Sequence, residues 1–528
     1  MKTVIRNATV IDGAGRPRFS GGVAFEGDVI TAVGPQLPGD FDREIDAGGK
    51  VVCPGFIDTH SHSDLYALCQ SAILPKIFQG ITTDVLGQDG ISMAPLPRQH
   101  VPAWRRNIGG LDGDSDGISW DYPTAQSYLA ALEASRPCQN YAYLAPHGNI
   151  RLEVMGFSGE TATQGQIRAM EDVLRRELEA GAIGLSSGLI YIPCVYANTE
   201  EMIRLCSVVR EYGKVFVVHQ RFEGDRILES MGELKKIALE SGVHLHISHF
   251  KMGGKKNEHK RFEAFKILEE LRQAGIEVSC DQYPYGAGST MLAGCIPPWA
   301  HVGGAGELLK RLREPKLREK IKHDILYNDT VWDNFIDFCT QEGIMVTSVE
   351  SKKNQCCVGK NIVEIGEMRG VDPLDAMMDL LVEEENKVGM VEFYGTEECV
   401  MDIMRRPEVN ICTDGLLGGT PHPRVYGAFP RVLGKYTREN KLFTLEEAIL
   451  KMTSKPAAAM GIRDRGVLAP GKKADIVFLD PDAVADVGDF INPRQYAKGI
   501  ERVIVNGKMV LEHGCVDERA ASGRVIRL

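Results

Sequence analysis

A pair of histidines separated by one residue is the first feature of this chain that could do chemistry. His60 and His62 end the apolar run VVCPGFIDTHSHSD. Alternate residues of a β-strand face the same side, so both imidazoles can point at one ion. Neutral imidazole is a common ligand of zinc and of related divalent ions. The pair therefore predicts a metal site at the end of an early strand.

Four further side chains stand where other apolar runs end. They are Asp89 in VLGQDG, His219 in KVFVVHQ, His249 in VHLHISHF and Asp414 in EVNICTDG. Each has an ordinary structural interpretation, because a strand histidine is usually a hydrogen-bonded core residue and an aspartate beside glycine usually forms a turn. The recurrence of imidazoles and carboxylates in the same kind of position is hard to obtain by chance. Together they favour one metal site.

The elements that would position these side chains alternate between helix and strand. Helical patterns such as TQGQIRAMEDVLRRELEAG and NTEEMIRLCSVVREYGK are each followed by a short apolar run. This rhythm predicts parallel strands joined by helical crossovers. The middle of the chain is long enough for a TIM-like (β/α)8 barrel, in which catalytic groups lie at the carboxyl ends of the strands. Side chains that end different strands would then meet at one face.

Both chain ends read differently from this middle. KTVIRNATVID near the start and IERVIVNGKMVLEHG near the end have the pattern of short strands. We expect the two ends to pair into one small β-sandwich domain, formed by residues 1–53 and 466–528. Residues 54–465 would form the metal-dependent barrel. The stretch 295–345 interrupts the helix–strand rhythm and is predicted to be an insertion.

Composition excludes several classes of partner. The chain has 528 residues, of which 43% are apolar and 25% charged, and its net charge is -11. An acidic chain of ordinary composition argues against nucleic acid or an anionic membrane as the main partner. No signal peptide and no membrane-spanning apolar run are recognisable, so we expect a cytoplasmic protein whose 13 scattered cysteines are reduced. The pattern predicts no particular oligomeric state.

At these motifs the chain resembles a known family. PGFIDTHSHSD is similar to the first metal motif of the amidohydrolase superfamily, and GVLAPGKKADIVFLD is similar to its C-terminal signature. More closely, VVHQRFEGD, HISHFK, DQYPYGAGST and CTDGLLGGTPHPRVYGAFPRVLGKY resemble the D-aminoacylases, or N-acyl-D-amino-acid deacylases. The resemblance covers nearly the whole chain. It implies a TIM-like barrel with a small β domain, and hydrolysis of N-acyl-D-amino acids to a carboxylate and a free D-amino acid.

The resemblance also implies a set of metal ligands, namely His60, His62, His219, His249 and Asp414. In the family, a cysteine in a Gly-Asn-Cys-Gly stretch is a further ligand, whereas this chain reads GQDG there. Asp89 would thus replace a thiolate by a harder carboxylate, which can bridge two ions. We expect zinc, as one ion or two, with manganese, cobalt and iron also compatible with a carboxylate ligand.

The implied chemistry is metal-assisted amide hydrolysis. Asp414 would take a proton from the attacking water and deliver it to the leaving amine. By resemblance, the α-carboxylate of a small-molecule N-acyl amino acid would be held by Lys251, Arg424, Tyr191 and Tyr283. An arginine fork suits a carboxylate well. Selection for the D-enantiomer follows from the resemblance alone.

Three other functions compete with this interpretation. A cyclic amidohydrolase of the dihydroorotase or hydantoinase type normally carries a carboxylated lysine at the end of its fourth strand, and no lysine stands at a comparable strand end here. A dipeptidase also cleaves an amide beside a carboxylate and stays an alternative. A non-catalytic scaffold of the same fold should have lost ligands, and this chain keeps four histidines and Asp414.

Overall fold

A closed barrel of parallel strands forms the centre of the protein. This computed structural model describes residues 1–327 and 331–528. Around the barrel the strands are β6 (Phe56–Asp58) continued by β7 (Ser61–His62), β8 (Ile81–Leu86), β9 (Asn140–Tyr143) continued by β10 (Ala145–Pro146), β11 (Gly184–Gly188), β12 (Val215–His219), β13 (His244–Ile247), β14 (Val278–Gln282) and β18 (Val409–Ile411) continued by β19 (Gly415–Leu416). The barrel closes where β19 pairs with β7, with Leu416 opposite His62.

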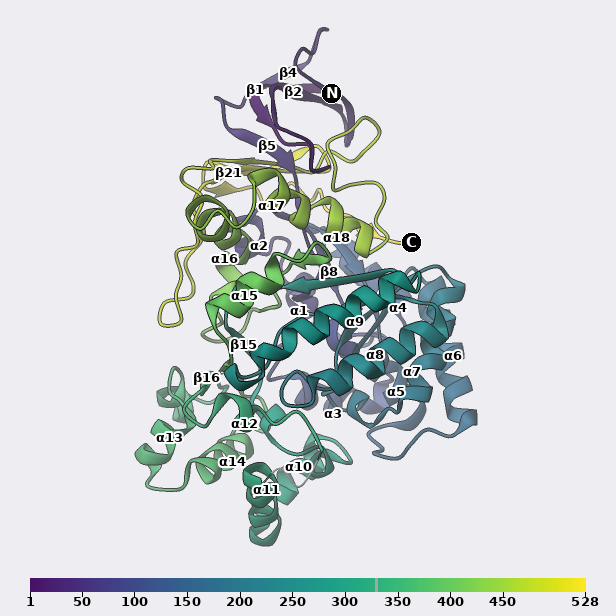
Figure 1. Ribbon diagram of the computed structural model, residues 1–528, viewed down its shortest axis with the longest axis vertical. Helices are drawn as coiled ribbons and strands as arrows, with labels where there is room; N and C mark the ends of the chain where they lie inside the picture. Colours follow the sequence, from purple (N-terminus) through teal and green to yellow (C-terminus); the bar gives the residue numbers. More distant parts are fainter. Residues whose placement is uncertain (328–330) are drawn as a thin grey trace.

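Helices connect successive strands and cover the outside of the barrel (Figure 1). α6 (Gln164–Glu179), α7 (Thr199–Glu211), α8 (Ile227–Ser241) and α9 (Arg261–Gln273) alternate with β11 to β14. Local sequence determines where α6 begins, because the Thr163 and Gln166 side chains form a reciprocal capping box. Parallel neighbours need such crossovers, so the predicted helix–strand rhythm is confirmed.

Apart from the helices between residues 305 and 383, which are described below, the remaining helices lie outside this run of crossovers. They are α1 (Asp64–Cys69), α2 (Leu74–Ile77), α3 (Val101–Ile108), α4 (Ala125–Ala134), α5 (His147–Met155), α15 (Glu397–Met404), α16 (Arg424–Arg431), α17 (Leu445–Met452) and α18 (Ser454–Ala459). α16 matters most for the site, because it begins at a predicted substrate residue and follows the last barrel strand.

Strands from both chain ends share a second sheet, which lies at the top of Figure 1. Its members are β1 (Lys2–Val10), β2 (Phe19–Glu26), β3 (Val29–Gly34), β4 (Arg43–Asp46), β5 (Val51–Pro54), β20 (Ile476–Leu479), β21 (Ile500–Val505), β22 (Lys508–Glu512) and β23 (Cys515–Val516). β5 pairs with β1 on one side and with β20 on the other. The predicted fold class, a TIM-like barrel with a β domain from both chain ends, is therefore confirmed. The final strand, β24 (Val525–Ile526), returns to the barrel and pairs with β9.

A third unit lies between β14 and β18, at the bottom of Figure 1. It contains an antiparallel sheet in which β17 (Gly389–Phe393) is central between β15 (Ala287–Met291) and β16 (Ile344–Ser348). Its helices are α10 (Ala305–Arg313), α11 (Pro315–Tyr327), α12 (Phe335–Cys339), α13 (Ile362–Arg369) and α14 (Pro373–Glu383). The insertion predicted at 295–345 lies within this longer segment, and the domain boundaries stay predictions.

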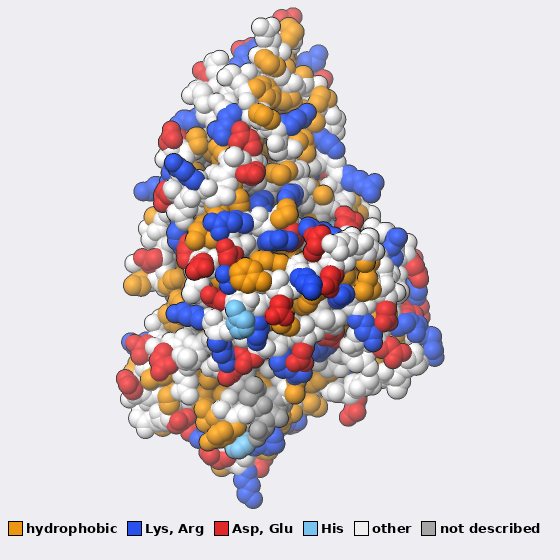
Figure 2. Space-filling model, viewed as in Figure 1, with side chains coloured by type: hydrophobic (Ala, Val, Ile, Leu, Met, Phe, Trp, Pro, Cys, Tyr) orange, Lys and Arg blue, Asp and Glu red, His pale blue; other side chains and the backbone are white. Residues whose placement is uncertain are grey.

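The visible surface mixes charges of both signs. Figure 2 shows lysine and arginine side chains interspersed with aspartate and glutamate over the barrel and the β domain. Across residues 1–327 and 331–528, no helix combines the length and the apolar character that crossing a bilayer requires.

Candidate active site

The six side chains predicted to bind metal come together at the carboxyl ends of the barrel strands. His60 lies between β6 and β7, His62 ends β7 and Asp89 follows β8, while the other three end or follow β12, β13 and β18. All are buried, and the most accessible, Asp414, is only 6% exposed. Polar side chains from strand ends far apart in the sequence thus lie close together, as expected at the carboxyl-terminal face of a barrel.

Asp89 lies at the centre of this cluster. Its Oδ1 is 3.6 Å from His60 Nε2 and 3.7 Å from His249 Nε2. Its Oδ2 is 3.4 Å from His62 Nε2. The carboxylate therefore faces three histidines at once, with Oδ1 toward His60 and His249 and Oδ2 toward His62.

The backbone around Asp89 is unusual. Asp89 has φ 56°, and the flanking Gly87 and Gly90 also have positive φ. A Cβ at Gly90 would lie 2.8 Å from Cys194 Sγ and 2.9 Å from the Cα of Ser187, so a side chain there does not fit. Non-glycine residues in this region of φ/ψ space are strained and concentrate at functional sites. The two glycines thus allow the chain to turn the Asp89 carboxylate toward the histidines.

Several polar atoms of the cluster make no hydrogen bond. Within the described residues, both ring nitrogens of His60, the Oδ1 of Asp89 and the Nε2 of His219 are buried without a hydrogen bond. Buried polar atoms are nearly always partnered in folded proteins. Three overlapping groups of these side chains each place their ligand atoms within 4.8 Å of one another. Imidazole nitrogens and carboxylate oxygens at this spacing fit a divalent transition metal.

Electrostatics favours ionised carboxylates in the cluster, but it acts differently on the individual histidines. Burial opposes the charge of His249 and of His62, yet neighbouring carboxylates raise the pKa of His249 to about 9 and that of His62 well above its usual value. Burial lowers the pKa of His219 to about 3, which keeps that imidazole neutral. Burial alone would raise the pKa of Asp89, but the neighbouring histidines hold it well below its usual range. Burial also acts against the charge of Asp414, and the charges of Arg424 and His60 overcome this effect and lower its pKa. Both carboxylates are therefore ionised at neutral pH.

Two carboxylates behind the histidines were not predicted from the sequence. Glu223 Oε1 is 3.3 Å from His249 Nδ1, and its Oε2 is 3.5 Å from His219 Nε2. Asp112 Oδ1 lies 3.3 Å from His62 Nδ1. Carboxylates in such positions orient metal-binding imidazoles. Glu223 stands four residues after His219 and could have been suspected, whereas Asp112 lies in a loop that carries no sequence signal.

The two predicted substrate cations already have carboxylate partners. Arg424 is fully buried at the start of α16, and its Nη1 is 2.9 Å from Asp414 Oδ2. Lys251 Nζ is 2.7 Å from Glu223 Oε2. Both cations thus border the ligand cluster, and each is held by a carboxylate that also contacts a histidine.

The two predicted tyrosines lie on either side of this region. The ring of Tyr191 packs edge-on against His219 with 5.4 Å between centroids, and its hydroxyl lies 2.8 Å from the Thr290 hydroxyl. The ring of Tyr283 lies beneath the Arg424 guanidinium at 4.3 Å. The structure therefore brings all the predicted site residues to one end of the barrel.

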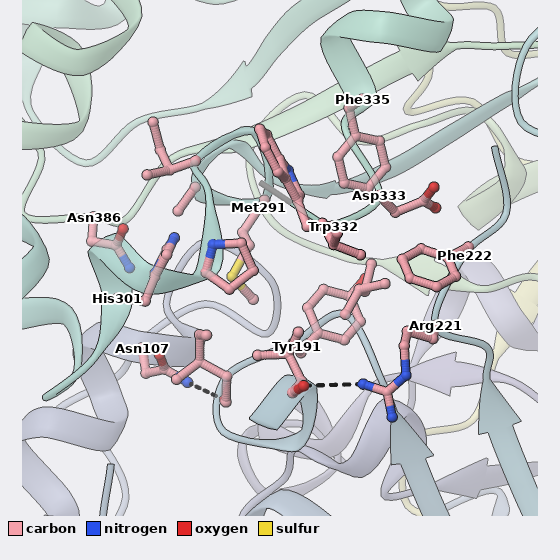
Figure 3. A pocket seen from close by; sticks show the side chains of 18 residues that line it. Asn107, Tyr191, Arg221, Phe222, Met291, His301, Trp332, Asp333, Phe335 and Asn386 are labelled. Atoms are coloured by element: carbon pink, nitrogen blue, oxygen red, sulfur yellow. Dashed lines mark hydrogen bonds between the residues drawn. The ribbon is translucent and has the colours of Figure 1, made fainter. Parts of the chain in front are cut away.

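A cavity of about 240 Å³ adjoins the cluster at Tyr191 (Figure 3). Its wall is largely apolar and includes Phe222, Met291, Trp332 and Phe335. The aromatic rings of this wall lie around one space in the view of Figure 3. A cavity of this character beside a polar site suits an organic substituent rather than an ion.

Two polar residues of the cavity wall need comment. Arg221 donates to the carbonyl oxygens of Val195 at 3.0 Å and Ala197 at 2.8 Å, and it pairs with Glu233 at 2.9 Å. Its charge is therefore engaged away from the cavity. His301 stands in a loop-like stretch of the sequence, which predicts a surface position, and this prediction is wrong. The structure buries His301 in the cavity wall at 8% exposure.

Comparison with known proteins identifies relatives along the whole chain. The model of the "Amidohydrolase family" matches residues 43–511. The D-aminoacylase of Alcaligenes xylosoxydans xylosoxydans is 34% identical over 524 residues, which cover 99% of this chain and 97% of that protein.

Solved structures give the same result. The N-acyl-D-glutamate deacylase of Bordetella bronchiseptica, complexed with zinc and a phosphonate inhibitor that mimics the tetrahedral intermediate, is 32% identical with a TM-score of 0.84 over 100% of this chain and 99% of that one. A D-aminoacylase described for its binuclear metal centre is 34% identical with a TM-score of 0.85 over the same shares.

Proposed function

We propose that this chain, which belongs to the amidohydrolase family, hydrolyses the amide bond of N-acyl-D-amino acids with the help of a divalent metal ion. The observation that carries the proposal is the contact between two sets of side chains. A buried cluster of histidines and carboxylates meets Arg424 and Lys251 through the Asp414 and Glu223 carboxylates. A hydrolytic centre and cations for an α-carboxylate thus lie side by side. The D-configuration is supported by the relatives.

The metal would be held by His60, His62, Asp89, His219, His249 and Asp414. The unpartnered nitrogens and the central position of Asp89 support this assignment. Zinc suits imidazole and carboxylate ligands, while the absence of a thiolate leaves manganese, cobalt and iron compatible. The two oxygens of Asp89 would allow one ion or two. A bound divalent ion supplies acidified water and polarises the amide carbonyl.

Asp414 is proposed to move the proton. Its Oδ1 faces His60 and His62 at 3.5 and 3.4 Å, while Oδ2 faces Arg424. An ionised carboxylate in this position can accept a proton from the attacking water and donate it to the departing nitrogen. An amine leaves poorly without that proton, so the same side chain would serve both steps.

Arg424 and Lys251, together with Tyr191 and Tyr283, would hold the α-carboxylate of the substrate. This anchor would place the amide carbon over the metal cluster. The low exposure of Arg424 and Lys251, 0% and 7%, limits competition from water. Charge-assisted hydrogen bonds gain strength in such surroundings.

The test is amine release from matched N-acetyl-D- and N-acetyl-L-amino acids by enzyme reconstituted separately with zinc, manganese and cobalt. Turnover confined to D-substrates is expected. If metal binds stoichiometrically and no N-acyl amino acid is cleaved, the proposal fails, and dipeptides and cyclic amides become the substrates to examine. If no metal binds, the chain is a scaffold.

A further inference from the structure

The turn that carries Asp89 is bonded at both ends by one side chain of strand β11. Ser186 lies on this strand and is fully buried. Its hydroxyl donates to the carbonyl oxygen of Gly87, and it accepts a hydrogen bond of 3.1 Å from the backbone N–H of Gly90. Ser186 has no role in the steps proposed above. Its two bonds enclose Gln88 and Asp89, so they act on the part of the turn that presents the metal ligand.

The backbone of β11 packs directly against this turn. A Cβ at Gly188 would lie 2.5 Å from the carbonyl oxygen of Asp89, and a Cβ at Gly90 would lie 2.9 Å from the Cα of Ser187. Such distances are too short for a real Cβ, so the contact needs both glycines. The close approach brings the Ser186 hydroxyl within hydrogen-bonding distance of the turn.

The opposite side of the turn is bonded to the segment that carries the histidine pair. The Oδ1 of Asp64 accepts a hydrogen bond of 2.9 Å from the N–H of Gly87, and the Gln88 side chain donates to the carbonyl oxygen of Thr59 at 2.6 Å. Thr59 and Asp64 stand on either side of the histidine pair in the sequence. The turn is thus held between that segment and β11, and Ser186 supplies the hydrogen bonds from β11.

Asp89 needs such support because its backbone is strained. Its φ of 56° lies in the left-handed region, which costs free energy for a residue with a side chain. Its carboxylate is only 2% exposed, and it faces His62 at 3.4 Å and His249 at 3.7 Å. A turn that could relax toward ordinary backbone angles would carry the carboxylate away from these histidines. Two hydrogen bonds from a buried hydroxyl oppose that movement.

The Ser186 hydroxyl is not placed to contact a substrate. A serine hydroxyl has a single donor, which Gly87 uses here, and the side chain is fully buried. The next residue of the strand differs, because the Ser187 hydroxyl lies 2.9 Å from Nδ1 of His147 and bonds that ring instead of the turn. Ser186 would therefore influence the reaction through Asp89.

We propose that Ser186 is a positioning residue that holds the Asp89 carboxylate in the metal cluster, so that the site is preorganised before the ion arrives. Groups that orient metal ligands from outside the ligand set contribute about 10- to 100-fold to metal affinity. The inference rests on the proposed function, and it assigns part of the metal affinity to a residue outside the ligand set.

The test measures the zinc affinity of the metal-free, full-length protein in competition with a chelator. Ser186→Ala removes both hydrogen bonds, so it should weaken zinc binding at least ~10-fold. Ser187→Ala is the matched control, because it removes the same group from an equally buried neighbour that bonds His147. Its zinc affinity should stay close to that of the wild type. An unchanged affinity in Ser186→Ala, or an equal loss in both variants, overturns the assignment.

A double-mutant cycle separates positioning from a general structural defect. If Ser186 acts through Asp89, Ser186→Ala should cause no further loss of zinc affinity once Asp89→Ala is present. A structural defect would instead weaken zinc binding by the same factor in both backgrounds. That result would remove Ser186 from the positioning role.

Ser186→Thr and Ser186→Val decide the question if Ser186→Ala does not fold. The two introduced side chains have nearly the same shape, and only that of Ser186→Thr carries a hydroxyl. Ser186→Thr is expected to bind zinc at least ~10-fold more tightly than Ser186→Val. Equal affinities of these two variants contradict the proposal.

Failure of this inference can be told apart from failure of the proposed function. A wild type that binds zinc and cleaves N-acyl-D-amino acids, with a zinc affinity that Ser186→Ala does not change, overturns the role of Ser186 alone. A wild type that binds zinc but cleaves no N-acyl amino acid overturns the deacylase proposal, while the zinc affinities still decide the role of Ser186. A wild type that binds no zinc overturns both.

Discussion

The metal cluster differs from the anchor region beside it, which consists of the proposed substrate-binding cations Arg424 and Lys251. The two regions differ in how their buried polar groups are partnered. In the cluster, both ring nitrogens of His60 and the Nε2 of His219 are buried without a hydrogen bond, and the nearest carboxylate oxygens lie about 3.5 Å away. In the anchor region, Arg424 and Lys251 are each paired with a carboxylate at less than 3 Å. The cluster is therefore set to receive a new group, whereas the anchors must share or exchange a partner when a substrate carboxylate arrives. Preorganisation is stronger where the ion would bind than where the substrate would bind.

The largest loss of activity is expected for Asp414→Asn, which tests whether proton transfer can be removed from the cluster without loss of metal binding. Asp414→Asn keeps an oxygen ligand but removes the base, so kcat should fall about 1,000-fold. Metal content, measured by atomic emission on the purified protein, should stay close to that of the wild type. Normal turnover by this variant would remove Asp414 from the proton-transfer role.

Asp89→Ala should show that the cluster depends on its central carboxylate. Three histidine contacts meet at Asp89, so its loss should weaken zinc binding at least ~100-fold in a competition with a chelator. Asp89→Cys is the informative control, because a thiolate should restore zinc affinity and disfavour manganese. Full metal binding by Asp89→Ala would mean that this side chain only shapes the turn.

Arg424→Ala should break the anchor region while sparing the cluster. Removing a charged hydrogen-bonding group costs roughly 2 kcal/mol, which corresponds to roughly a 30-fold rise in KM. Arg424→Lys should recover part of the loss, because it restores the charge without the fork. An unchanged KM with zinc bound would exclude Arg424 from substrate binding.

The smallest effect is expected for a substitution of Glu223, which tests whether this residue links the metal cluster to the anchor region. Glu223 contacts both His249 and Lys251, so Glu223→Gln should lower zinc affinity about 10-fold and raise KM as well. The two measurements decide between its roles. A change in zinc affinity alone would make Glu223 a positioning residue for the histidines, and a change in KM alone would assign it to Lys251.

Sequence patterns could predict the cluster because its members share one local signal. His219 and Asp414, like the others, terminate or follow an apolar strand, and the barrel brings all such ends together. Asp112 reaches His62 from a loop, and His301 is buried by an insertion whose packing no local pattern describes. Side chains placed by contacts between distant segments are the ones that sequence alone does not locate.

The short strand β24 has a consequence for how the molecule is made. It covers the free edge of β9, where Arg524 N donates to the Asn140 side chain across 384 positions of sequence. While the ribosome is still translating the residues between them, that edge of the barrel wall has no partner strand. An open edge can pair with other chains, so this edge is prone to intermolecular pairing until β24 docks on it. This edge of β9 is covered only once Val525 and Ile526 have docked.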